Sequence, residues 1–340
     1  MSVAHYHVFI PGLFAPLTLW QRDFGFQPES PGLMRLLADY QQQQLPVTGL
    51  ERSLLHHLGC DVAEQLPWSV LRHRFESGGM YQPPLLCADP VHLQSGSDAI
   101  VLNPVAPELS PAEAERIITD LNQHLEQDGL ILKAFHPQRW YLHQLDERFS
   151  HSLPQTTPLP EVGKGNIFPA LPQGGDKYWH QLLNEIQMLL HNHSINQARE
   201  HSGQLPVNGV WFWGEGDADT DGLRQTTSVQ GGGVCGQVIA AAIKTPWQSN
   251  INSDTHAMPE SGDVLMILDQ LQSAVAVDQP QVWQQALDGL SEYFDYLYGV
   301  LHSGGNVSLY DTSGRIFACE RVPGWQFWRP KNADWQQLIN

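Results

Sequence analysis

The feature that most restricts the fold is an alternation of short apolar runs with longer amphipathic segments in the C-terminal part of the chain. The apolar runs at 207–213, 263–268 and 306–310 have the length of buried strands. The segments at 234–243 and 280–301 place apolar residues at helical spacing. Strands that alternate with helices usually pair in parallel, because each crossover needs a connection of helix length. We therefore predict a parallel sheet flanked by helices.

The N-terminal part contributes further elements to this fold. A strand is expected at 5–10, where the turn residues Pro11 and Gly12 end it. A helix is expected at 31–40, with Ser30 as its N-cap, and another at 50–58. The expected fold class is a three-layer α/β sandwich around a mostly parallel sheet.

A second kind of pattern occupies the segment between residues 85 and 145. Strands are expected at 85–93, 99–102, 130–135 and 139–144, with a helix at 110–128 between the two pairs. Ser110 and Glu113 have the spacing of a capping box at the start of that helix. This order of elements predicts a compact α+β unit of its own.

These patterns divide the chain into two domains. Residues 152–175 are rich in Pro and Gly and are interpreted as a linker or surface excursion, followed by a long helix at about 177–202. We expect residues 1–77 and 151–340 to form the α/β core, and residues 78–150 to form the inserted α+β domain.

Charge and cysteine content exclude several classes of protein. The formal net charge is −18, which argues against a nucleic-acid or anionic-membrane partner, because both require a basic face. The four cysteines are far apart in sequence, which argues against a disulfide scaffold or a zinc ribbon. No basic leader and no run of about 20 apolar residues is present. We expect a soluble, cytoplasmic protein.

The most informative motif runs from Asn208 to Gly216. An apolar strand that carries Trp211 and Trp213 on one face is followed by Gly-x-Gly. Ligands of open α/β sheets bind at the carboxyl ends of the strands, so this motif is a candidate for part of a binding site. A Trp-rich core strand that ends in a turn explains the same residues.

Polar residues on the long helix and in the α+β unit are further candidates. Asn196 and Arg199 share a helix face, whereas His191 and His193 are two residues apart and do not. Arg139 beside Trp140 is suited to an anion, since a guanidinium matches carboxylate and phosphate. A structural ion pair with one of the many acids is the competing interpretation.

Two loop motifs carry weaker signals. Three glycines at 231–233 precede an apolar helix, but the Lys-Ser/Thr of a P-loop is missing. Asp217, Asp219 and Asp221 match the first half of a calcium loop, whose twelfth position here is Ser228 rather than Glu. An acidic solvated loop is the expected structure of the second motif.

The motif at 208–216 resembles the Asn-x-x-Trp-x-Trp-Gly-x-Gly segment of archaeal-type cofactor-independent phosphoglycerate mutases, members of the alkaline phosphatase superfamily. Leu58-Gly-Cys-Asp61 is similar to the Leu-Gly-Tyr-Asp segment of that family, and the segment from Ser30 to Leu37 is similar to another of its motifs. Together with the segments 89–93 and 136–141, the chain resembles a bacterial subgroup labelled RpfE-type regulatory proteins. The resemblance implies an alkaline-phosphatase-like fold with an inserted domain.

The resemblance also implies a chemistry that can be sought residue by residue. The mutases use two divalent metals held by Asp and His, with a Ser nucleophile. The Asp after the first strand is replaced here by Pro11, and the nucleophile position after Thr48-Gly49 holds Leu50. The later Asp-His pair is replaced by Asp311-Thr312, and Asp269 has lost its partner His.

These losses imply a non-catalytic, regulatory or binding protein rather than a mutase. The expected partner is a small phosphorylated or carboxylate metabolite, or a protein, held at the cleft between the domains. No cofactor is expected. The candidate ligand-binding residues are Asp89, His92, Arg139, Asn196, Arg199, Asn208, Trp211 and Trp213.

Two alternatives stay open. An active metal-dependent phosphomutase or phosphatase would need Mn or Zn at a rebuilt site, with His191, His193 or His256 and Asp254 as ligands. A purely structural interaction protein would bind no small anion.

Overall fold

The chain forms two compact units in the computed structural model. Unit 1 comprises Met1–Ala63 and Thr220–Asn340, and unit 2 comprises Glu64–Asp219. Unit 2 lies between the two segments of unit 1 in sequence, but its bounds differ from the 78–150 expected for an inserted domain. The structure describes residues 3–79, 82–96, 99–163, 165–174, 177–220, 222–249, 261–321 and 335–339.

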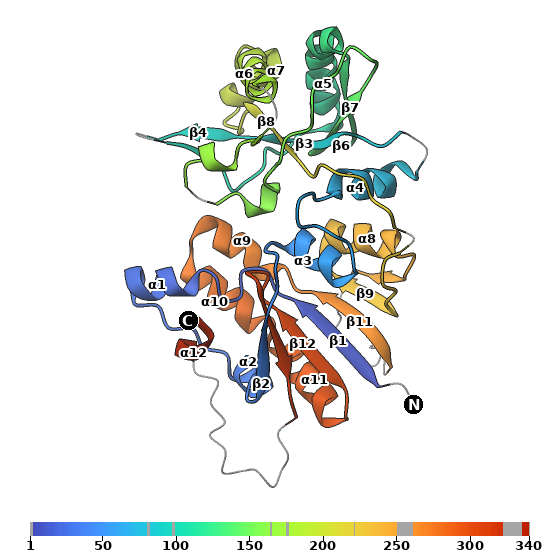
Figure 1. Cartoon of the computed structure of the whole chain (residues 1–340). Helices are drawn as coiled ribbons and strands as arrows, with labels where there is room; N and C mark the ends of the chain where they lie inside the picture. Colours follow the sequence, from blue (N-terminus) through green and yellow to red (C-terminus); the bar gives the residue numbers. More distant parts are fainter. Residues whose placement is uncertain are drawn as a thin grey trace. The chain divides into compact units, whose positions relative to one another are not determined.

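Unit 1 is built on a mostly parallel, seven-stranded sheet in the order β10-β9-β11-β1-β12-β13-β2 (Figure 1). The strands from β10 to β12 run parallel, and β13 is antiparallel to both of its neighbours. Parallel pairing buries both faces, which explains the continuous apolar runs read in the sequence. The strands are β1 (Ala4–Phe9), β2 (Tyr40–Gln44), β9 (Ser228–Gly231), β10 (Trp247–Gln248), β11 (Gly262–Ile267), β12 (Asn306–Tyr310) and β13 (Arg315–Cys319).

One face of this sheet forms the main hydrophobic core of unit 1. Alternate residues of β1, such as Tyr6 and Val8, pack there with helix residues such as Trp283 and Phe294. On the other face, the α3 residue His57 contacts His7 and Phe9. The helices are α1 (Leu17–Phe24), α2 (Pro31–Leu36), α3 (Leu50–His57), α8 (Gly233–Ala242), α9 (Gln270–Val277), α10 (Pro280–Asp288), α11 (Ser291–His302) and α12 (Trp335–Ile339).

Unit 2 contains a four-stranded antiparallel sheet in the order β6-β7-β3-β8. Helices α5 and α6 cover one face, where Ile117 and Ile186 pack against Trp140 and Phe212. Helix α4 supplies Arg72 to the other face. The strands are β3 (Leu86–Val91), β6 (Leu130–His136), β7 (Arg139–Gln144) and β8 (Gly209–Trp213), with β4 (Leu93–Ser95) and β5 (Ile100–Leu102) as a separate pair; the helices are α4 (Trp68–Ser77), α5 (Pro111–Leu125), α6 (Tyr178–His191) and α7 (Ser194–His201).

The position of the Trp-rich strand corrects the sequence analysis. The prediction of a strand at 207–213 is confirmed as β8, but its assignment to the parallel sheet is wrong. Strand β8 pairs antiparallel with β3, with Trp211 opposite Asp89 and Trp213 opposite Cys87. A strand buried on both faces is apolar throughout in either sheet, so its composition does not reveal its neighbour.

Two expected long helices are each divided. The helix expected at 177–202 is α6 followed by α7, and His193 is the N-cap of α7, with its Nδ1 accepting from Ile195 N–H. The helix expected at 280–301 is α10 followed by α11, with Gly289 at the end of α10. A cap within an amphipathic run ends one helix and begins another without disturbing the apolar periodicity.

The mostly parallel α/β architecture confirms the predicted fold class. The capping box predicted at Ser110 and Glu113 is also confirmed. The helices and strands that the sequence analysis missed are α1, β2, α4, β9, β10, α9, β13 and α12. Among the described residues, no helix combines the length and the apolar character needed to cross a bilayer.

Candidate functional site

A site is expected at the carboxyl edge of the unit 1 sheet, because the loops that follow parallel strands lie together at that edge. Strand β1 ends at Phe9 and continues into a turn with Ile10 buried. Pro11 follows, and Gly12 adopts a φ of 80°. A Cβ at Gly12 would lie 2.8 Å from Val275 Cγ2, so the backbone passes very close to α9. This loop offers no side-chain metal ligand at the position where the resemblance implies an Asp.

The next loop, after β12, carries an Asp that is fully engaged within the fold. Asp311 is 1% exposed. Its Oδ1 accepts from Ser313 N–H and Arg315 N–H, and its Oδ2 accepts from Ser313 Oγ and Arg315 Nε. The carboxylate thereby closes the turn between β12 and β13, which accounts for its burial.

The carboxylates of Glu51 and Asp269 act on the thiol of Cys235 at this edge. Glu51 lies in the first turn of α3, Cys235 in the first turn of α8, and Asp269 directly precedes α9. Burial raises the pKa of the Cys235 thiol, and the carboxylates of Glu51 and Asp269 raise it further. Burial also raises the pKa of Asp269. The thiol is therefore protonated at neutral pH, which makes it a poor nucleophile and a poor metal ligand.

These residues do not fit the two-metal centre that the resemblance implies. Such a centre needs several carboxylates and imidazoles, yet Pro11 and Leu50 carry no donor atom, and Leu50 is buried at the start of α3. Asp311 is already bonded to Arg315. Asp269 remains as a single matching ligand, without the His expected near it.

A buried charge network in unit 2 contains three of the eight candidate residues. Arg72 Nη1 and Nη2 donate to the two carboxylate oxygens of Asp89 at 2.8 and 2.7 Å. Both side chains are almost inaccessible, at 4% and 6% exposure. Trp213 Nε1 donates to Asp89 Oδ2 at 2.8 Å, and Trp140 N–H donates to Oδ1. The negative charge of Asp89 is thus fully compensated.

The same network extends outward to Arg139. Arg72 Nε donates to the Tyr141 hydroxyl, which in turn donates to Glu76 Oε2 at 2.6 Å. Glu76 Oε1 accepts from Arg139 Nε. The guanidinium predicted to bind an anion is therefore neutralised by a carboxylate of the chain itself, as in the structural ion pair considered from the sequence.

The remaining polar candidates bind the backbone. Asn208 accepts from Leu93 N–H and donates to Leu93 O, while His92 Nδ1 lies 2.9 Å from Pro206 O. The Asn196 side chain accepts from Val207 N–H and donates to Val207 O. Arg199 donates to Leu205 O and to the Glu113 carboxylate. These contacts fix the segment that leads into β8. Ligand binding by these residues stays a prediction.

The sequence analysis missed Arg72, Glu76 and Tyr141, the residues that join the network. Arg72 and Glu76 lie on α4, a helix that was not predicted. The available signal was Trp68 and Leu71 at helical spacing, followed by the glycine C-cap Gly78.

Trp211 lines a pocket of unit 2 with a volume of about 170 Å³. Its Nε1 donates to Thr157 O, which holds the indole ring. The polar side chains of the wall are His180, Asn184 and Gln187; the apolar ones include Ile167 and Leu183. An apolar pocket with a few polar groups is the usual form of a small-molecule site, and this one is small.

Of the residues of the alternative metal site, His191 and His193 lie within the described part of the chain. His191 is exposed at the end of α6, and His193 Nε2 lies 3.2 Å from Asp120. Asp254 and His256 lie outside the described residues, as does Asp221 of the acidic loop. Asp217 and Asp219 are exposed, as expected for a solvated loop.

The polyglycine turn has a packing explanation. Gly232 adopts a φ of 70°, and a Cβ there would lie 2.8 Å from Ile267 Cβ. The close approach of this turn to β11 therefore requires glycine, and packing explains the residue without any need for phosphate binding.

No family model matches the chain. In sequence it is 28% identical, over 153 residues, to a probable 2,3-bisphosphoglycerate-independent phosphoglycerate mutase of Geobacter sulfurreducens, with 44% of this chain and 37% of the relative covered. It is also 28% identical over 112 residues to the 2,3-bisphosphoglycerate-independent phosphoglycerate mutase of Methanosarcina mazei, with 32% of this chain and 28% of the relative covered. The aligned parts span well under half the length of these relatives.

In fold, the chain is similar to the solved structure of the PH0037 protein from Pyrococcus horikoshii. The TM-score is 0.51 at 11% identity, with 94% of this chain and 88% of the other covered. At this identity the likeness concerns the fold alone. The chain is therefore similar to phosphoglycerate mutases of the 2,3-bisphosphoglycerate-independent type over part of its sequence, and it has a mostly parallel α/β fold of the kind that the resemblance implied.

Proposed function

We propose that this protein is a non-catalytic relative of the phosphoglycerate mutases with a binding or regulatory role in the cell. The observation that carries the proposal is the donor set at the carboxyl edge of the unit 1 sheet. Pro11 and Leu50 replace a ligand and a nucleophile, and Asp311 is held by Arg315. Loss of even one member of a catalytic constellation lowers turnover by orders of magnitude. We also propose that the protein is cytoplasmic and that its regulatory role is of the kind the RpfE-type resemblance implies.

The test is an assay of phosphoryl chemistry on the full chain. Hydrolysis of p-nitrophenyl phosphate and conversion of 3-phosphoglycerate are followed with Mg²⁺, Mn²⁺ and Zn²⁺ in turn. We expect no turnover above that of the matched variant Asp269→Asn, since Asp269 is the single retained ligand of the implied centre. Metal-dependent turnover that this substitution abolishes would show an active enzyme and overturn the proposal.

The pocket at Trp211 favours a small ligand over a purely structural role. Its walls are mainly apolar, while Asn184 and Gln187 present amide groups that can form hydrogen bonds. A carboxylate metabolite with an apolar body matches this lining, because the side-chain amides of Asn184 and Gln187 can donate to a carboxylate without a full cation. A volume of about 170 Å³ limits the ligand to a few carbon atoms.

Binding is tested by thermal denaturation with isovalerate and with 3-phosphoglycerate. We expect isovalerate to raise the melting temperature, since a ligand at 100 times its Kd stabilises by about 2.7 kcal/mol. Leu183→Trp fills the pocket and should remove the shift. Leu189→Trp, on an exposed position of the same helix, should retain it. A shift with neither compound would favour the purely structural interaction protein.

A further inference from the structure

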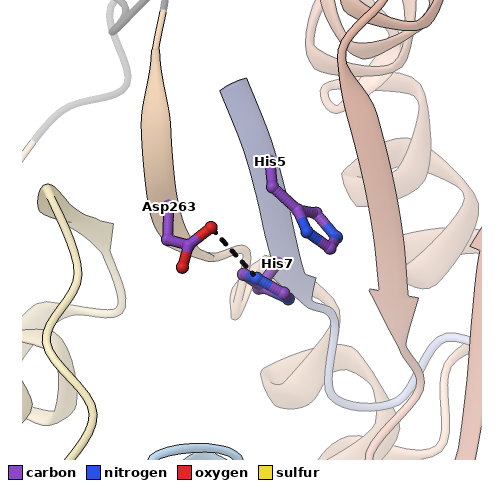
Figure 2. Close-up of side chains that lie close together, drawn as sticks. All are labelled: His5, His7 and Asp263. Carbon is purple, nitrogen blue, oxygen red and sulfur yellow. Dashed lines mark ion pairs between the residues drawn. The ribbon is translucent and has the colours of Figure 1, made fainter. Parts of the chain in front are cut away.

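A separate cluster of histidines lies on the central strands of the unit 1 sheet. His5 and His7 alternate along β1, so both project from the face opposite the core residues Tyr6 and Val8. Asp263 on the neighbouring strand β11 is in register with His5. Figure 2 shows the two imidazoles side by side, with the carboxylate directed at His7. His5 and Asp263 are each the second residue of their strand, and His7 lies in the second half of β1, two residues before its end.

The distances suit a shared ion after a small adjustment. One ligand atom from each of the three side chains lies within 4.8 Å of the others. His7 Nε2 is 4.0 Å from Asp263 Oδ1, and the rings of His5 and His7 have centroids 3.9 Å apart. Metal bonds of about 2.0–2.2 Å separate tetrahedral ligand atoms by roughly 3.4 Å. The Asp263 side chain is 45% exposed and has room to close this difference.

Neighbouring side chains hold both imidazoles in place. The Ser308 hydroxyl lies 3.0 Å from His5 Nε2, and the Tyr310 hydroxyl lies 3.4 Å from His7 Nδ1. Tyr310 is itself 3.0 Å from His57 Nδ1. A metal-binding histidine normally engages its second nitrogen in such a hydrogen bond, which orients the ring. His7 thus directs Nε2 toward Asp263 while Nδ1 faces Tyr310.

We propose that His5, His7 and Asp263 bind one divalent transition-metal ion, and that Zn²⁺ is the ion best matched by their two nitrogen ligands and one oxygen ligand. The bound ion cross-links β1 to β11, the central parallel pair of unit 1. Partial exposure of Asp263 leaves a position open to water. This site is independent of the phosphoryl chemistry addressed above, and its failure would leave the proposed function standing.

One neighbour opposes the ion. Arg224 is close enough to disfavour protonation of His5, His7 and His57, so its charge also repels a metal cation. Arg224 is exposed, which lets water weaken this repulsion. The substitution Arg224→Gln should therefore tighten binding, an effect that a site elsewhere on the chain would not show.

The experiment is calorimetric titration of ZnCl₂ into the full chain, freed of any affinity tag and treated with chelator. We expect one strong site per chain. Asp263→Asn and His7→Asn should each weaken Zn²⁺ binding by at least about 100-fold, which exceeds the effect of losing a hydrogen bond to a metal ligand. Tyr310→Phe should weaken it by roughly 10-fold. His302→Ala, on an exposed histidine of the same unit, should leave it unchanged.

Titration with Co²⁺ gives a second readout, because visible absorption bands report tetrahedral coordination of nitrogen and oxygen. Absence of a one-to-one site in the wild type overturns the proposal. So does a site that Asp263→Asn leaves intact. Because Asp263 is half exposed, this variant decides the question even if His7→Asn fails to fold.

Discussion

At the scale of single residues, the clearest lesson concerns Asp89 and Arg72. The sequence places an Asp within an apolar strand, which is compatible with a binding site. The structure shows that Arg72 and Asp89 form a bidentate pair. Trp213 Nε1 donates to the Asp89 carboxylate, and the Arg72 guanidinium lies over the Tyr141 ring. A buried pair of this kind is costly to break, because the surviving partner keeps its charge without solvent.

Substitution of Asp89 by Asn should therefore destabilise unit 2 strongly. The variant leaves the Arg72 guanidinium buried without a counter-charge, and we expect a loss of about 3–5 kcal/mol in the free energy of unfolding. Urea denaturation of the full chain, followed by tryptophan fluorescence, measures this loss. Unit 2 contains the Trp residues 68, 140, 179, 211 and 213, which report on its transition.

The matched control is Asp146→Asn in the same unit. Asp146 pairs with Arg148 at the surface, where water screens the charges, so its replacement should cost far less. An Asp89→Asn variant as stable as this control would mean that the buried pair contributes little, and the structural explanation of Asp89 would then be wrong.

At the scale of elements, local signals placed helix α5 and strand β12 correctly. Helix α5 begins where Ser110, Pro111 and Glu113 place it, because the capping atoms belong to the helix itself. Strand β12 covers the predicted residues 306–310. The division of 177–202 into α6 and α7 was not anticipated, since His193 is an uncommon N-cap.

The capping box of α5 allows a prediction at this scale. Ser110 Oγ accepts from Glu113 N–H, and Glu113 Oε2 accepts from Ser110 N–H. Ser110→Ala removes the first of these bonds and should lower the free energy of unfolding of unit 2 by about 1 kcal/mol. Thermal or urea denaturation measures the change.

Ser273→Ala, within the exposed part of α9, is the comparison for this variant. Alanine has the higher helix propensity, so this substitution should cause no loss of stability. Equal effects of the two substitutions would contradict a capping role for Ser110, because they would show a general response to loss of a serine hydroxyl.

At the scale of the whole molecule, the two units differ in how their sheets are assembled. The mostly parallel sheet of unit 1 combines β1 and β2 from the N-terminal segment with strands from beyond residue 220. The antiparallel sheet of unit 2 joins β3 to β8, which are separated by more than one hundred residues in the sequence. The periodicity of the sequence does not predict such pairings, because each strand shows only its own burial pattern.

The sequence by itself determined the class of fold, the strands β1, β11 and β12 of unit 1, the capped helix α5, and the presence of Pro11 and Leu50 where the resemblance implies a metal ligand and a nucleophile. These depend on residue type and local spacing. The tertiary structure decided the neighbour of β8, the partners of Asp89, Arg139 and Asn196, and the meeting of His5 and His7 with Asp263. A hydrogen bond or a metal site needs atoms within a few ångströms, and for residues far apart in sequence only the packing of strands sets that distance.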